Sequence, residues 1–311
     1  MSYVFGPVPS RRLGRSLGID VIPPKTCSFD CIFCESGPTT RLSVRRDNFA
    51  EPSEILEELS TFFRLHPNAA DVLTLSSAGE PTLYSGIGKL IGAVKDAYPR
   101  FPLIVLTNGS LLWDPEVRRS LLKADRVVPS LNSVTPSVFR KINRPHPSLE
   151  PGQIIDGLRT FRAEYKGRLH IEIVLVSGVN NHPEELSELA RAIEPIRPDK
   201  VELNTVVRPP AYSGTLGLTK ARMAWAASFF SSLNTETIGI FEGEAQDCSA
   251  REIETRIIET VERRPCTIAE LAASLGVAEK TVELESARLR DQGKLGILRF
   301  GRKLFLSRLI Q

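Results

Sequence analysis

The sequence lacks any apolar run that approaches the ~20 residues needed to cross a bilayer, and its N-terminus lacks the apolar core of a signal peptide. It has only five cysteines, an odd number that fits a reducing compartment better than a disulfide scaffold. It has no phosphate-binding P-loop, and no spacing indicates a Ser-His-Asp triad or paired catalytic carboxylates. Lysine and arginine (40) nearly balance aspartate and glutamate (37), so net charge alone does not indicate nucleic-acid binding. We therefore expect a cytoplasmic protein without a membrane partner.

Three of the five cysteines lie close together. Cys27, Cys31 and Cys34 are spaced four and then three residues apart. A loop of this kind can give three thiolates to one iron–sulfur cluster and leave one iron open to another molecule. A structural zinc site would normally add a fourth Cys or His nearby, whereas the next cysteine is Cys248 and none of the four histidines lies close in sequence. The spacing therefore favours an iron–sulfur site over structural zinc or three unrelated thiols.

The pattern C-x3-C-x-aromatic-C resembles the signature of the radical S-adenosylmethionine (SAM) superfamily. The resemblance implies a [4Fe–4S] cluster that binds the amino and carboxylate groups of SAM. It implies reductive cleavage of SAM to a 5′-deoxyadenosyl radical that abstracts hydrogen from a substrate, with a reductant such as flavodoxin or ferredoxin. It also implies that Phe33, the aromatic residue before the last cysteine, packs near the adenine of SAM.

The chain alternates between short β-type runs and amphipathic helical stretches. The expected strands are Gly18–Ile22, Val72–Ser76, Leu103–Leu106, Arg126–Ser130, Leu169–Val176 and Val201–Asn204. The expected helices are Ser53–Arg64, Ile87–Ala97, Pro115–Leu122, Pro136–Ile142, Gln153–Ala163, Pro183–Ala192 and Lys220–Leu233. Six β-then-α units require a parallel sheet with right-handed crossovers. We predict an α/β fold in which residues 1–235 form a partial (β/α)6 TIM-type barrel, the form typical of radical SAM cores.

Parallel sheets place ligands at the carboxyl ends of their strands, where this chain has polar residues. Gly79 and Glu80 follow the second expected strand; the family's Gly-Glu motif binds the SAM amino group, so the resemblance gives Glu80 that role. Asn108, Ser130 and Asn132 follow the next two strands, where related enzymes face the SAM ribose or carboxylate. Many relatives carry Asp where this chain has Asn132, and ordinary turn chemistry is the alternative for all three.

Three further segments indicate which branch of the radical SAM superfamily the chain resembles. They are residues 5–18 before the cysteines, Phe139–Pro145, and Leu203–Pro210. Together they resemble the Fe–S oxidoreductase branch grouped with wyosine-type tRNA tricyclic-purine synthases, over about residues 3–235. Such a synthase is expected to carry a second cysteine set before the radical motif, whereas no cysteine precedes Cys27, which argues against the same reaction. Arg144 and Arg208 lie at expected element ends facing the pocket, so we treat them as candidate substrate or cofactor contacts.

The tail differs from the rest of the chain. We predict a linker over residues 236–250 and a winged helix-turn-helix domain over 251–311, with helices at Arg251–Arg263, Ile268–Leu275 and Ala278–Gln292 and a hairpin at residues 295–306. The third helix offers Glu279, Glu283 and Glu285, which a phosphate backbone would repel, so sequence-specific DNA binding is not expected. The basic hairpin leaves RNA contact open, and winged helices also bind peptides. Cys266 is expected to be a buried thiol, and Cys248 a free one.

Two hypotheses follow. The first is a radical SAM enzyme that acts on RNA or on a peptide or protein. The second is a regulator whose cluster senses redox state or SAM and whose winged helix binds nucleic acid. The full set of cofactor-type residues favours the enzyme.

Overall fold

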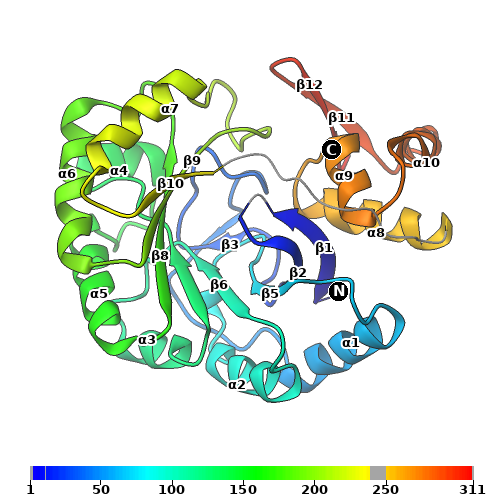
Figure 1. Cartoon of the computed structure of the whole chain (residues 1–311), viewed down its shortest axis with the longest axis horizontal. Helices are drawn as coiled ribbons and strands as arrows, with labels where there is room; N and C mark the ends of the chain where they lie inside the picture. Colours follow the sequence, from blue (N-terminus) through cyan, green and yellow to red (C-terminus); the bar gives the residue numbers. More distant parts are fainter. Residues whose placement is uncertain (1–2, 11, 239–249, 310–311) are drawn as a thin grey trace.

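A single eight-stranded sheet organises most of the chain (Figure 1). The computed structural model describes residues 3–10, 12–238 and 250–309. The strand order is β1-β2-β5-β6-β7-β8-β9-β10. All pairs from β2 to β10 are parallel, and β1 is antiparallel to β2. The strands are β1 (Val4–Ser10), β2 (Gly14–Ile19), β5 (Val72–Leu75), β6 (Leu103–Thr107), β7 (Arg126–Pro129), β8 (Arg168–Leu175), β9 (Lys200–Thr205) and β10 (Thr235–Thr237).

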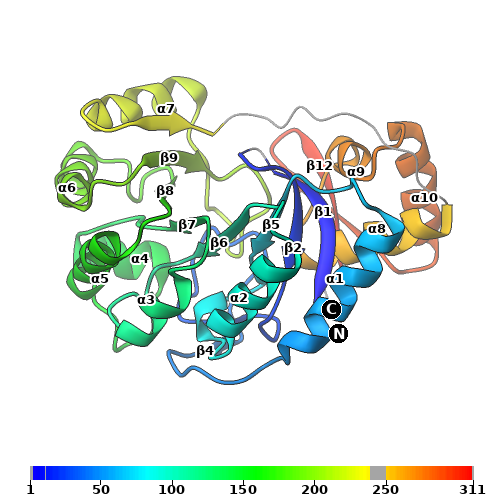
Figure 2. The same ribbon diagram turned by 60° about the horizontal axis from the view of Figure 1, so that its bottom comes forward.

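Helices follow the parallel strands and cover the outer face of the curved sheet (Figures 1 and 2). They are α1 (Pro52–Leu65), α2 (Ile87–Ala97), α3 (Pro115–Leu121), α4 (Pro136–Asn143), α5 (Pro151–Glu164), α6 (Pro183–Ile193) and α7 (Lys220–Ala227). Five of them begin with proline, whose missing N–H and fixed φ suit the first helical position. One continuous apolar core lies between these helices and the sheet. The predicted partial barrel is confirmed.

The structure departs from the predicted elements at both edges of the sheet. The first parallel strand ends at Ile19 rather than Ile22. Val4–Ser10 forms an additional strand that the sequence hides, because two prolines and a glycine interrupt it; prolines are tolerated there because β1 is the edge strand.

At the other edge, α7 ends at Ala227 instead of continuing to Leu233, and a short 3-10 helix, η3 (Ser228–Phe230), follows it. The linker predicted from residue 236 is wrong at its first end, because Thr235–Thr237 pairs with β9. Residues 239–249 of that linker, including Cys248, lie outside the described residues.

Residues 250–309 contain three helices and a hairpin where the sequence predicts them: α8 (Ala250–Arg263), α9 (Ile268–Leu275), α10 (Glu279–Asp291), β11 (Gly296–Phe300) and β12 (Lys303–Ser307). They enclose a second apolar core in which Cys266 is buried. This C-terminal part packs through α8 and α9 on β1 (Figure 2). Arg263 lies over the ring of Phe5, and Ser274 Oγ donates to the carbonyl of Pro7. None of the helices in the described ranges is long and apolar enough to cross a membrane.

Candidate active site

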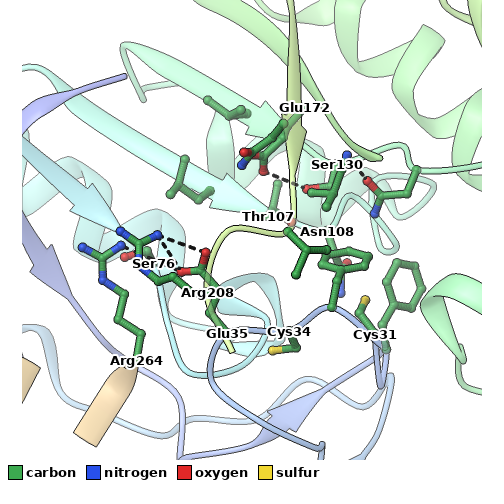
Figure 3. Close-up of a pocket in the computed structure, with 18 of the residues that line it drawn as sticks. Cys31, Cys34, Glu35, Ser76, Thr107, Asn108, Ser130, Glu172, Arg208 and Arg264 are labelled. Atoms are coloured by element: carbon green, nitrogen blue, oxygen red, sulfur yellow. Dashed lines mark hydrogen bonds and ion pairs between the residues drawn. The ribbon is translucent and has the colours of Figure 1, made fainter. Parts of the chain in front are cut away.

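The barrel holds a cavity of about 370 Å³ at the carboxyl ends of its parallel strands (Figure 3). All three clustered cysteines line it, so the structure brings them together with the polar residues that follow the strands. Its other lining residues include Phe33, Glu35, Ser76, Gly79, Glu80, Thr107, Asn108, Ser130, Asn132, Asn143, Glu172, Asn204, Arg208 and, from the C-terminal part, Arg264. This is the position at which parallel α/β folds bind ligands.

Backbone contacts fix the cysteine loop over the cavity. Its first residues pair with Arg41–Leu42 (β4) through the short strand β3 (Thr26–Cys27). The amides of Asp30 and Ile32 donate to carbonyls at the end of α4, those of Asn143 (3.0 Å) and Ile142 (3.0 Å). The loop is therefore held by ordered elements at its start and at its middle.

Each cysteine sulfur accepts a hydrogen bond from a different part of the chain. Cys27 Sγ accepts from the Phe29 amide (3.5 Å) and from Asn108 Nδ2 (3.6 Å). Cys31 Sγ accepts from Asn143 Nδ2 (3.3 Å), and Cys34 Sγ accepts from Lys25 Nζ (3.5 Å). Hydrogen bonds to the sulfurs tune iron–sulfur clusters. Sequence reasoning missed Lys25 and Asn143, since nothing in sequence spacing places either beside a particular sulfur.

The buried environment of Cys27 and Cys31 disfavours free thiolates at these two positions. Burial, helped by the nearby Glu80 carboxylate, raises the pKa of the Cys27 thiol to about 12. Burial and the neighbouring sulfurs raise the pKa of Cys31 well above its ordinary value. A coordinated metal supplies the positive charge that keeps such thiols deprotonated. The three cysteines that line the cavity fit the ligand set of an iron–sulfur cluster, whereas a structural zinc site would need a fourth ligand.

Glu80 lies on the wall of the cavity and is 1% exposed. Its Oε1 accepts from the Thr82 amide (2.9 Å) and from the hydroxyls of Thr82 (2.6 Å) and Thr107 (2.6 Å), and its Oε2 accepts from the Asn108 amide (2.7 Å). Burial raises the pKa of Glu80 above its usual value, although these hydrogen bonds oppose the shift. No described cation pairs with it. The carboxylate is thus positioned entirely by neutral donors.

Gly79 is needed for packing against the cysteine strand. A Cβ at this position would lie 1.9 Å from the carbonyl of Thr26, which also accepts from the Glu80 amide (3.1 Å). The close approach that sequence reasoning expected is therefore made to the protein's own backbone. The absence of a Cβ at Gly79 lets the loop at residues 76–82 pack directly on the strand that leads into Cys27.

The next three predicted residues have different environments. Asn108 faces the cysteines, since its Nδ2 also donates to Ser28 Oγ (2.8 Å). Ser130 Oγ donates weakly to Glu172 (3.5 Å) and lines the cavity. Asn132 is buried, and its Oδ1 accepts from the Val174 amide (2.8 Å). Its side chain therefore joins the end of β7 to β8, a structural role that the strand-end position alone did not reveal.

Phe33 lines the cavity and packs against an apolar cluster of Ile142, Val176 and Val206. Phe300, at the tip of the C-terminal hairpin, packs against the same cluster. The C-terminal hairpin and the cysteine loop thus contact the same apolar cluster.

The two predicted arginines are paired within the protein. Arg144 is not among the residues lining the cavity; its Nε lies 3.1 Å from Asp30 and its guanidinium lies over the ring of Tyr212. Arg208 reaches the cavity but is 2% exposed, and it binds Glu35 (3.1 Å) and Glu270 (2.5 Å) of α9. These pairs account for its charge, so Arg208 joins the residue after Cys34 to the C-terminal part.

A largely buried charge network, two members of which line the cavity, was not predicted. Arg12, in the turn between β1 and β2, donates to Glu172 (2.7 Å) and to Glu202 (2.7 Å). His170 Nδ1 lies 2.6 Å from Glu202. Burial opposes ionisation of Glu202, but His170 and Arg12 outweigh it and lower the pKa of this carboxyl. The partners are 160 and 190 residues from Arg12, and no local pattern could indicate them.

Comparison with known proteins identifies the family to which the chain belongs. Residues 21–190 match the radical SAM superfamily. The UPF0026 protein of Methanocaldococcus jannaschii is 37% identical over 212 residues, 68% of this chain and 65% of that protein. The UPF0026 protein of Synechocystis is 38% identical over 207 residues, 66% of this chain and 76% of that protein.

A third relative matches nearly the whole chain. A protein of Brachyspira hyodysenteriae named GTPase Obg is 34% identical over 305 residues, 96% of this chain but only 45% of that protein. The match therefore includes the C-terminal part, and this chain spans less than half of that relative.

Solved structures agree on the fold. A radical SAM methyltransferase from Sphaerobacter thermophilus superposes with a TM-score of 0.56 at 18% identity, covering 71% of this chain and 66% of that one. Streptococcus suis SuiB bound to its precursor peptide SuiA gives 0.54 at 18% identity, covering 74% and 50%. The chain therefore belongs to the radical SAM superfamily, as one of the UPF0026 proteins, and its cofactors are SAM and a [4Fe–4S] cluster.

Proposed function

We propose that Cys27, Cys31 and Cys34 hold the cluster, that Glu80 binds the amino group of SAM, and that the enzyme abstracts hydrogen from RNA or from a peptide or protein. The observation that carries the proposal is the convergence of three cysteine sulfurs and one buried, cation-free carboxylate on the same cavity. When bound, the cluster supplies the electron that cleaves SAM to methionine and the 5′-deoxyadenosyl radical. An external reductant of the flavodoxin or ferredoxin class would supply that electron.

The environment of Glu80 fits an ammonium ligand. A carboxylate has about four acceptor positions. Three described donors reach Oε1 and only one reaches Oε2, so Oε2 has acceptor capacity left toward the cavity. A buried charge without a partner is costly, and a bound ammonium would remove that cost.

Other lining residues take smaller parts in the proposal. Asn108 orients Ser28 and Cys27, Phe33 provides an apolar face for the adenine, and Ser130 offers a hydroxyl to the ribose or carboxylate. Asn132, Arg144 and Arg208 have no proposed contact with SAM or substrate, because their side chains are bonded within the protein or lie outside the cavity.

The C-terminal part, residues 250–309, is proposed as a winged-helix domain that shapes access for a macromolecular substrate. Its separate core supports a division from the barrel, which comprises the described residues up to 238. The resemblance to wyosine-type enzymes favours RNA, and the similarity in fold to SuiB with its bound peptide makes a peptide a reasonable alternative.

A regulator that reads DNA is not favoured. The basic residues of α10 are partly neutralised within the protein: Arg288 pairs with Glu254 (2.6 Å) and Glu285 (2.5 Å). Cations that are already paired gain little from a phosphate backbone.

Cysteine variants test the cluster ligands. Replacing Cys27, Cys31 or Cys34 with Ala should abolish the visible absorbance of the cluster after anaerobic reconstitution, whereas Cys266→Ala and Cys248→Ala should retain it. A full cluster in the Cys31→Ala protein would refute the ligand assignment.

The substrate class is tested by 5′-deoxyadenosine formation. The reduced, reconstituted enzyme is incubated with SAM and either small RNA or protein extract from the host. Stimulation by one fraction identifies the class, and treatment of that fraction with ribonuclease or protease should remove the effect. Absence of 5′-deoxyadenosine with every fraction, despite an intact cluster, would contradict the proposed reaction.

A further inference from the structure

Lys25 is a buried cation beside the cysteine loop. The residue is 5% exposed, and its ammonium lies 3.5 Å from Cys34 Sγ. No carboxylate among the described residues forms an ion pair with it. Its one described side-chain partner is therefore a sulfur atom.

The backbone holds this side chain in place. Lys25 has a φ of 61°, which is unusual for a residue with a side chain. Its amide donates to Ala78 (2.9 Å), and its carbonyl accepts from the amides of Thr40 (3.1 Å) and Arg41 (3.0 Å). The loop that carries Glu80 and the strand β4 thus fix Lys25 in a strained conformation from two sides. Strain of this kind persists where the surrounding structure overdetermines it, commonly at functional sites.

A buried ammonium requires a nearby anion. Thiol sulfur is only a weak acceptor, so a free Cys34 would compensate the charge poorly. The donors to the other two sulfurs are the neutral groups of Phe29, Asn108 and Asn143. Lys25 is therefore the one formally charged donor that the described residues present to the cysteines.

We propose that Lys25 is the charge partner of the iron–sulfur cluster and raises its reduction potential. The inference rests on the proposed cluster ligands. A cluster held by three thiolates becomes more negative when it accepts an electron from the external reductant. A fixed positive charge next to one thiolate stabilises the reduced state more than the oxidised state. Lys25 is thus a positioning residue that acts through Cys34.

The test compares Lys25→Met with the wild-type enzyme in potentiometric titrations of the full-length, reconstituted protein without SAM. Methionine keeps an unbranched side chain, so the backbone strain at this position is unchanged. We expect a lower midpoint potential in Lys25→Met and a value closer to wild type in Lys25→Arg. Lys95→Met is the matched control, because Lys95 pairs with Asp125 (2.7 Å) on the outer layer and should leave the potential unchanged. An unchanged potential in a fully loaded Lys25→Met enzyme overturns the inference.

Thermal melting provides a second readout that does not need the variant to hold a cluster. If Lys25 serves the cluster, the apo form of Lys25→Met should melt at or above the temperature of the apo wild type, because an uncompensated charge has been removed. The gain in melting temperature on reconstitution should be smaller than in the wild type. Lys95→Met should lower the melting temperatures of the apo and the reconstituted forms by the same amount. A lower melting temperature for apo Lys25→Met would make Lys25 a structural residue and overturn the proposal.

Failure of the proposed cluster ligands would look different. In that case the wild-type protein would hold no cluster, or the Cys31→Ala protein would hold a full one. Neither result depends on Lys25.

Discussion

At the scale of single residues, the carboxylate of Glu80 is surrounded by neutral donors. The hydroxyls and amides of Thr82, Thr107 and Asn108 fix its position without neutralising its charge. Truncation to alanine would leave these buried donors unsatisfied and would confuse loss of binding with loss of stability. Glutamine removes the charge while keeping the shape.

We therefore predict that Glu80→Gln leaves the cluster content unchanged and raises the Kd for SAM at least tenfold, which corresponds to about 1.4 kcal/mol. Isothermal titration of SAM into the anaerobic, loaded protein measures this. Glu150→Gln, at an exposed position outside the cavity, serves as the control. An unchanged Kd in Glu80→Gln would remove Glu80 from the SAM site.

Sequence reasoning found the residues of the site more successfully than their roles. The cysteines, Glu80, Asn108 and Ser130 all line the cavity, because strand-end positions determine which residues meet there. Asn132 and Arg208 share such positions, yet their side chains bond to the protein. Which way a polar side chain turns depends on partners distant in sequence. For the same reason Lys25 and Asn143 were missed.

At the scale of elements, most helices were predicted to within a few residues, because amphipathic periodicity and N-terminal prolines mark them clearly. The edge strands β1 and β10 were not predicted. The first contains prolines, and the second has only three residues, so neither produces an alternating apolar pattern. Both segments become strands because they pair with a neighbouring strand, and a local sequence pattern does not indicate such a contact.

Arg208 connects two elements, the cysteine loop and α9. Its removal takes a cation from Glu270 and leaves Glu35 with the longer pair to Arg264 (3.9 Å). We predict that Arg208→Met lowers the free energy of unfolding by about 3 kcal/mol, at the low end for buried pairs because both glutamates are partly exposed. Urea unfolding of the apo-protein measures it.

A compensated variant separates charge from packing. Combining Arg208→Met with Glu35→Gln and Glu270→Gln removes all three charges. Glutamine can still close the capping box that Glu270 makes with Thr267. Recovery of most of the lost stability is expected, and no recovery would show that the ion pairs are not what Arg208 contributes.

Phe300 of the C-terminal hairpin packs against the same apolar cluster as Ile32 and Phe33 of the cysteine loop. We predict that Phe300→Ala accelerates loss of the cluster in air severalfold, because the apolar packing beside the loop is weakened. The decay of visible absorbance after exposure to oxygen measures this rate. Leu304→Ala, on the same hairpin but 53% exposed, should decay like the wild type, and equal rates in both variants would contradict the predicted role.

At the scale of the whole molecule, Arg12 links the first turn of the chain to strands on the other side of the barrel. Loss of its guanidinium would leave Glu172 and Glu202 close together in a largely buried site. We predict that Arg12→Met lowers the free energy of unfolding by about 3 kcal/mol. Arg15→Met, which removes a more exposed pair with Asp71, should cost less than about 1 kcal/mol. Similar losses in the two variants would mean that the network does not tie the barrel together.

The cysteine loop is enclosed by residues that are synthesised long after it. Asn143 follows Cys31 by 112 residues, and Arg208 follows Glu35 by 173. Glu270, which completes the pairing of Arg208, comes later still. A nascent chain therefore presents its three cysteines on the ribosome before their surrounding wall exists. The enclosure around the cysteine loop is therefore complete only after the C-terminal part has been synthesised and has packed on the barrel.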